Sequence, residues 1–96
     1  MYQVKKLKGH SSAQCKVALT ANSITLISYT TAIIKAERFD GGYIVTCSGL
    51  YSMTTRKHIS WFIQEYFPAL NFQEIKSIAG LDKHIYIDRY NNATIV

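Results

Sequence analysis

Three features are scarce in this sequence: long apolar runs, cysteines, and acidic residues near the start. No apolar run approaches the roughly 20 residues of a membrane-spanning helix, and residues 1–10 are polar, without the apolar middle of a signal peptide. The two cysteines, Cys15 and Cys47, lie in apolar stretches and form no C-x-x-C pair. We therefore expect a cytoplasmic protein with no membrane contact, in which both cysteines are buried free thiols.

The sequence also lacks the motifs of common enzyme classes. It has no Walker loop, no G-x-G-x-x-G, no H-E-x-x-H and no G-x-S-x-G. The histidines His10, His58 and His84 do not have the spacing of metal ligands, and the acidic residues are scattered, so no pair suggests general acid–base catalysis. These absences favour a binding protein over an enzyme, with no cofactor and no metal site.

The positive charge is concentrated in the first third of the chain. We treat the 96 residues, 1–96, as a single domain, and a hydrophobic content of 48% excludes a disordered chain. The six bases and six acids of residues 37–96 cancel, whereas residues 1–36 hold five lysines and no acid. This asymmetry favours a polyanion or an acidic partner surface, although a bias that only aids solubility would look the same. The five lysines are Lys5, Lys6, Lys8, Lys16 and Lys35.

Alternating apolar and polar residues predict several strands. Residues 3–8 form either a first strand or part of a flexible basic arm that spans residues 1–10. Residues 14–20 alternate as a half-buried strand does, and Ala21-Asn22 reads as a turn. Residues 23–37 are rich in β-branched residues and predict one long bent strand or two short ones.

A tight hairpin is predicted at Asp40-Gly41-Gly42, because glycine accepts a positive φ at little cost. The hairpin would place Ile34 and Ala36 on the same face as Val45 and Cys47. Near the end, the alternation resumes at residues 85–87, and Asn91-Asn92 is expected to turn the chain so that Ile95 joins the sheet.

Two helices are predicted between these strands. The first runs from about Thr54 to Phe67, before Pro68, and the second from about Phe72 to Ala79, with Asn71 and Glu74 at the spacing of a capping box. Apolar residues recur at helical spacing in the first: Ile59, Phe62, Ile63 and Tyr66. We therefore predict an α+β fold, an antiparallel sheet of four to five strands with two helices packed on one face, in the order β-β-β-α-α-β.

The start of the first predicted helix gathers side chains that bind anions. A helix N-terminus presents unpaired amides and partial positive charge, which suit a phosphate or carboxylate. Cations there oppose the helix dipole and cost a few tenths of a kcal/mol, which suggests a role for them. The alternative is that the hydroxyls only cap the helix and the cations are only solvated. The candidate binding residues here are Ser52, Thr54, Thr55, Arg56, Lys57 and His58.

Trp61 is a further candidate contact residue. At 100° per residue it projects away from the apolar stripe of the helix, on the side of Lys57. A tryptophan beside cations is typical of a partner contact or a stacked base, but the arm or the second helix could equally cover it. A third feature, Ser28-Tyr29-Thr30-Thr31, places hydroxyls in an apolar stretch. They either bond to the helix start or face outward beside it.

Two of these segments resemble a known group of proteins. Ser28-Tyr29-x-Thr31 and the run from Tyr51 to Ile59 are similar to the S-Y-x-T strand and the Y-S-x-T-T-x-K-H-I helix start of small uncharacterised proteins from bacteriophages and other mobile elements. The resemblance covers about residues 24–67 and leaves the basic N-terminus and the second helix outside it. It implies a short cytoplasmic accessory protein of mobile-element origin and no catalytic residues.

Three functions are consistent with these features. The leading hypothesis is binding to nucleic acid or to a host nucleoprotein, in which the N-terminal lysines and the helix start contact phosphates and Trp61 stacks or packs. The second is inhibition of a host defence protein by masking its surface, as anti-CRISPR proteins do. The third is a homodimeric structural or assembly component, in which residues 23–29 form an apolar edge strand that pairs between subunits.

Overall fold

The turn at Asp40 and Gly41 joins the two central strands. Both residues have positive φ, 50° and 81°, as a two-residue hairpin turn requires. The turn connects β4 (Thr31–Phe39) to β5 (Gly42–Cys47). The register pairs Ile34 with Cys47 and Ala36 with Val45, which confirms the predicted hairpin and the residues that share its buried face.

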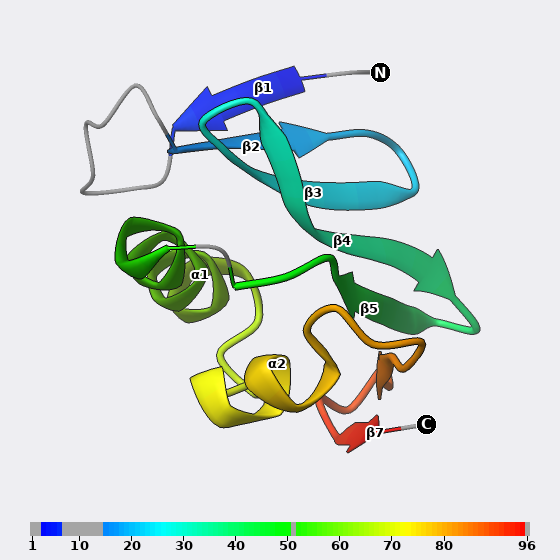
Figure 1. Cartoon of the computed structure of the whole chain (residues 1–96). Coiled ribbons are helices and arrows are strands. Elements are labelled where there is room, and N and C mark those ends of the chain that lie inside the picture. The colour runs from blue at the N-terminus through cyan, green and yellow to red at the C-terminus, as the bar shows by residue number, and fades with distance from the viewer. Residues whose placement is uncertain (1–2, 7–14, 51, 96) are drawn as a thin grey trace.

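A computed structural model describes residues 3–6, 15–50 and 52–95. In it, seven antiparallel strands form one sheet whose spatial order is the order of the chain (Figure 1). The α+β class and the antiparallel sheet are as predicted, but the prediction of four to five strands was too low. The predicted order β-β-β-α-α-β was also wrong, because five strands precede the two helices and two strands follow them. The remaining strands are β1 (Gln3–Lys6), β2 (Cys15–Leu19), β3 (Ser23–Ser28), β6 (Ile85–Ile87) and β7 (Ala93–Ile95).

The two extra strands have separate origins. Residues 23–37 form β3 and β4, separated by a turn at Tyr29 and Thr30, and Tyr29 has a φ of 57°. Tyrosine is not a residue typical of turns with positive φ, so the sequence alone does not show whether residues 23–37 form one strand or two. Gln3–Lys6 is a strand paired with β2 and not an arm, while residues 7–14 lie outside the described part of the chain. The predicted turn at Asn91 is confirmed: it has a φ of 65° and leads into β7.

The position of β3 contradicts the predicted route to a homodimer. Residues 23–28 pair with β2 on one side and with β4 on the other, so their backbone groups are already bonded. Among the described strands, the edges of the sheet are β1 and β7. Residues 23–29 therefore cannot serve as an edge strand between subunits.

The helices begin and end close to the predicted residues. The first, α1 (Met53–Tyr66), is capped by the Ser52 side chain, which accepts a hydrogen bond from the amide of Thr55. The second, α2 (Phe72–Ile78), starts with the expected capping box of Asn71 and Glu74. Both helices lie on one face of the sheet (Figure 1).

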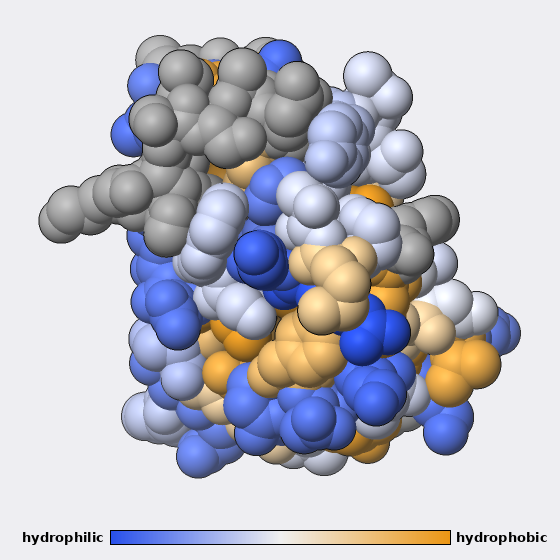
Figure 2. Space-filling model, turned by 60° about the vertical axis from the view of Figure 1, so that its left-hand side comes forward, coloured by the Kyte–Doolittle hydropathy of each residue, from blue (hydrophilic) through white to orange (hydrophobic). Residues whose placement is uncertain are grey.

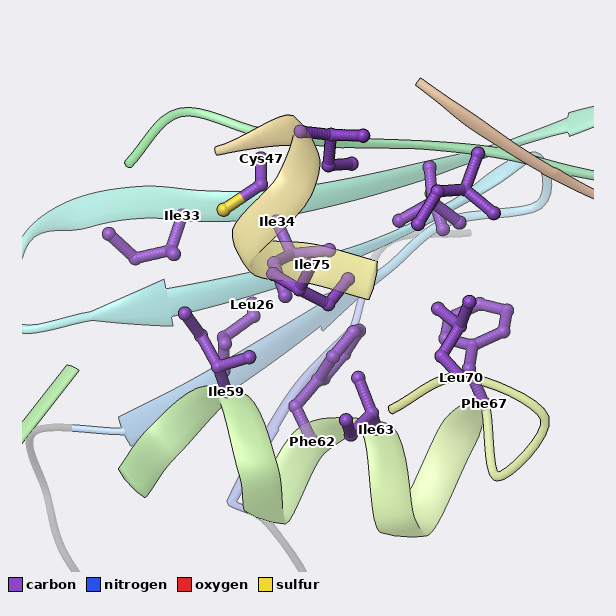
Figure 3. Close-up of a cluster of buried hydrophobic side chains, with 14 of the residues drawn as sticks. Leu26, Ile33, Ile34, Cys47, Ile59, Phe62, Ile63, Phe67, Leu70 and Ile75 are labelled. Atoms are coloured by element: carbon purple, nitrogen blue, oxygen red, sulfur yellow. The ribbon is translucent and has the colours of Figure 1, made fainter. Parts of the chain in front are cut away.

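A single apolar core fills the space between the helices and the sheet. Ile59, Phe62 and Ile63 of α1 and Ile75 of α2 project toward Leu26 and its neighbours on the strands (Figure 3). Cys15 and Cys47 are both buried free thiols, as expected. Gly41 is required by its positive φ, whereas Gly42 is required by lack of space. A Cβ atom at position 42 would lie 1.8 Å from the carbonyl oxygen of Ile87 on β6.

Candidate binding surfaces

The start of α1 is connected to the sheet by a chain of hydrogen bonds. Ser28, at the end of β3, lies with its Oγ atom 2.8 Å from Nδ1 of His58 and 3.4 Å from Oγ1 of Thr55. The Thr55 hydroxyl in turn lies 3.2 Å from the Oγ atom of Ser52. Of the two alternatives for Ser28, the structure shows the first: its hydroxyl bonds to the helix start.

His58 is enclosed by this hydrogen-bond chain and by two aromatic rings. Its ring centroid lies 6.1 Å from that of Tyr29 and 5.4 Å from that of Trp61. Because burial disfavours the charged form, the pKa of His58 is lowered from its ordinary value. The imidazole is therefore neutral at pH 7 and has one nitrogen free to accept a hydrogen bond, consistent with the Ser28 hydroxyl donating to Nδ1.

The distance between Ser28 and His58 would suit a nucleophile and its general base, but a substrate cannot reach the pair. Only 2% of Ser28 and 1% of His58 are exposed, so a substrate carbonyl has no approach to the serine oxygen. Thr55 is similarly buried, at 3%. We assign Ser28, Thr55 and His58 to the attachment of α1, and we leave Thr55 and His58 out of any contact surface.

The other candidates on α1 line an open hollow. Arg56, Lys57 and Trp61 project on one side of the helix, where Phe72 at the start of α2 faces them across a hollow of about 330 Å³. Trp61 is half-buried and packs against the core, and it shares the lining of this hollow with Phe72 of α2. Apolar surface bordered by hydrophilic surface is visible on the side of the molecule that carries α1 (Figure 2).

Residues that the sequence did not single out complete this hollow. Met53 and Ser60 line it, and a second hollow of about 380 Å³ adjoins it, since Ser60 and Phe72 line both. The signal was present in the sequence: Met53, Arg56 and Ser60 fall at i, i+3 and i+7, which places them on one face of a helix. Thr54 is exposed but lines neither hollow, and Ser52 is engaged as the helix cap.

Of the N-terminal lysines, Lys16 lies on a surface separate from the α1 hollow. Pairing of β1 with β2 places Lys6 opposite Lys16 and Lys5 opposite Val17. Lys16 projects from the sheet face opposite the helices, because its neighbours Cys15 and Val17 are buried in the core. Lys5, paired with Val17, is on the helix side of the sheet, so the sequence grouped residues that belong to different surfaces. Lys8 lies outside the described residues.

One family model matches this chain. It is described as a family of unknown function (DUF8033) and matches residues 3–76. The chain belongs to the DUF8033 family. The DUF8033 match includes the lysines of β1 and β2 and most of α2, so it extends well beyond residues 24–67, to which the sequence resemblance was confined. No curated protein and no solved structure matches the chain.

The described residues contain neither a cluster of metal ligands nor a membrane-spanning helix. Among residues 3–6, 15–50 and 52–95, no three histidine, cysteine or acidic side chains gather as metal ligands would. Within the same residues, no helix is long and apolar enough to cross a membrane.

Proposed function

We propose that this protein is a non-enzymatic accessory protein that binds nucleic acid through the lysines of the β1–β2 hairpin. The observation that carries the proposal is the register of that hairpin, which pairs Lys16 with Lys6. Lysines that are ten residues apart in the sequence thereby occupy paired positions on adjacent strands, and Lys16 is exposed. Lys5 is exposed as well, on the other face of the hairpin, because its partner is Val17.

The charge arrangement supports a polyanionic ligand. Like charges directly opposite each other on paired strands destabilise a sheet, and a bound anion would offset that repulsion. No acidic residue occurs in residues 1–36, so no carboxylate of this segment competes with the ligand. Lysine contacts to phosphates are independent of base sequence, and their strength falls with salt because counterions are released.

The origin and location of the protein belong to the same proposal. The resemblance of the Ser28 and Ser52 segments to small mobile-element proteins supports a phage or plasmid origin, and two buried free thiols are consistent with a reducing cytoplasm. The nucleic acid would then be that of the element or of a host nucleoprotein in a bacterial cell.

Fluorescence anisotropy of labelled single-stranded and duplex DNA and RNA tests the proposal. Binding should be measurable at low salt and should weaken steeply toward physiological salt. The variant with Lys6→Gln and Lys16→Gln should bind more weakly and should reduce the log–log salt slope by about 1 to 2.

The matched control removes two exposed lysines elsewhere, Lys76→Gln with Lys83→Gln, and should leave the slope nearly unchanged. Absence of binding at low salt would overturn the proposal, because the electrostatic contribution is largest there. Equal losses in the two double variants would show that only net charge matters and would remove the hairpin as a site.

A further inference from the structure

The groove beside α1 is independent of the lysine hairpin and has its own chemistry. Its two hollows, of about 330 and 380 Å³, adjoin at Ser60 and Phe72 and together follow α1 along the side that faces the start of α2. Hollows of this size lie at the lower end of the range of pockets that hold a small ligand, and each is large enough for a single side chain.

The first hollow combines apolar surface with positive charge. Met53 is 70% exposed, and Trp61 and Phe72 are half-buried beside it. Arg56 and Lys57 line the same hollow, and among the residues that the structure describes no acidic side chain lines either hollow. A tryptophan, a mobile thioether and an arginine are side chains enriched at contacts between proteins.

The charges of α1 run against the helix dipole. The helix has no acidic residue in its first turn and no basic residue in its last, whereas Arg56 and Lys57 lie near its start. This arrangement slightly destabilises the isolated helix. A negatively charged ligand over Arg56 and Lys57 would remove that disadvantage, so the groove is electrostatically complementary to an acidic segment.

We propose that this groove binds an extended acidic segment of a protein partner, with carboxylates against Arg56 and Lys57 and an apolar side chain in the hollow lined by Trp61 and Phe72. A protein is favoured over nucleic acid because the described lining of the groove holds only two cations, Arg56 and Lys57. In addition, Trp61 packs against the core, so its exposed part can contact a side chain but not a stack of bases. The occupant is thus a mixed acidic and apolar peptide.

Trp61 supplies a direct measurement, because it is the single tryptophan of the chain. Because Trp61 lines the groove, its fluorescence emission reports on binding there. The probes are three synthetic peptides and one oligonucleotide: an Asp/Glu peptide with Leu and Phe, the same peptide with Lys in place of its acids, the acidic peptide with Ser in place of Leu and Phe, and single-stranded DNA.

Only the first peptide is expected to shift the emission with saturation. The charge reversal Arg56→Glu with Lys57→Glu should weaken its binding about tenfold or more. Acidic residues near a helix start are favoured by the dipole, so this variant should keep or raise its thermal midpoint, and a loss of binding cannot be attributed to unfolding. The Lys6→Gln and Lys16→Gln variant should bind the peptide as the wild type does.

Three outcomes would overturn the inference. The first is no change in emission with the acidic–apolar peptide, and the second is an equal response to the lysine peptide. The third is a response to single-stranded DNA that the reversal of Arg56 and Lys57 abolishes. That result would make the groove a nucleic-acid surface. The nucleic-acid proposal for the β1–β2 hairpin is tested by a different variant pair and stands or fails separately.

Discussion

The Oγ atom of Ser28 lies 2.8 Å from Nδ1 of His58, and this contact joins two segments that are 30 residues apart. The same two segments carry the resemblance to mobile-element proteins. Their side chains meet inside the protein, where they attach α1 to the turn between β3 and β4. Part of the motif thus has a role in the fold, whereas Arg56 and Lys57 of the same motif are exposed.

Removing the Ser28 hydroxyl should destabilise the protein. In Ser28→Ala, Nδ1 of His58 loses its partner in a buried site, and the expected loss is about 1–3 kcal/mol in the free energy of unfolding. Urea denaturation followed by circular dichroism measures it. Thr30→Ala, at the exposed turn nearby, is the control and should change stability by less than about 0.5 kcal/mol. Equal effects of the two substitutions would contradict the assigned role.

Stability should decrease with acidification because of His58. Burial lowers the pKa of His58, so below pH of about 6.5, the ordinary value, the unfolded chain takes up a proton that the folded protein does not. The stabilisation is complete above that pH. It is lost as the pH falls toward the lower folded pKa, with a slope of at most about 1.4 kcal/mol per pH unit.

His58→Asn isolates this contribution, because asparagine can still accept the Ser28 hydrogen bond but does not titrate. The difference in unfolding free energy between wild type and variant should narrow from pH 7 to pH 5. A difference that stays constant over this range would show that His58 is not the titrating group.

Glycine should be better tolerated than alanine at position 29. Tyr29 has a φ of 57°, and its ring lies beside His58. Both substitutions remove the ring, but only alanine retains the steric cost of the left-handed conformation. Tyr29→Gly should therefore be more stable than Tyr29→Ala by about 1 kcal/mol. Thermal denaturation of the two variants decides it, and the usual order, with alanine the more stable, would argue against a left-handed residue here.

The two thiols should be unreactive while the protein is folded. Burial raises the pKa of Cys15 to about 11 and raises that of Cys47 above its ordinary value, so little thiolate is present at pH 8. A colorimetric disulfide reagent should label both only in denaturant. Since β2 and β5 are three strand spacings apart, about 14 Å, oxidation should not join the two cysteines. Labelling at the same rate in buffer and in urea would refute the assigned burial.

Local signals predicted much of this fold. The Asp40-Gly41 turn, both helix starts and the buried faces of β4 and β5 follow from residues a few positions apart, and all are observed. The sequence left open whether residues 23–37 form one strand or two, because no glycine or asparagine marks the turn at Tyr29. The inward positions of Thr55 and His58 were missed, since polar side chains at helical spacing normally indicate a solvated face.

The strand order described above has a consequence for folding. Each strand after β1 pairs with the strand that precedes it in the chain. The connections are short except the one between β5 and β6, which contains both helices. Contacts between residues close in sequence form with a small loss of chain entropy, and proteins rich in them fold fast. We therefore expect the first five strands to assemble as successive hairpins, and closure of the β5–β6 loop over the two helices to complete the native state.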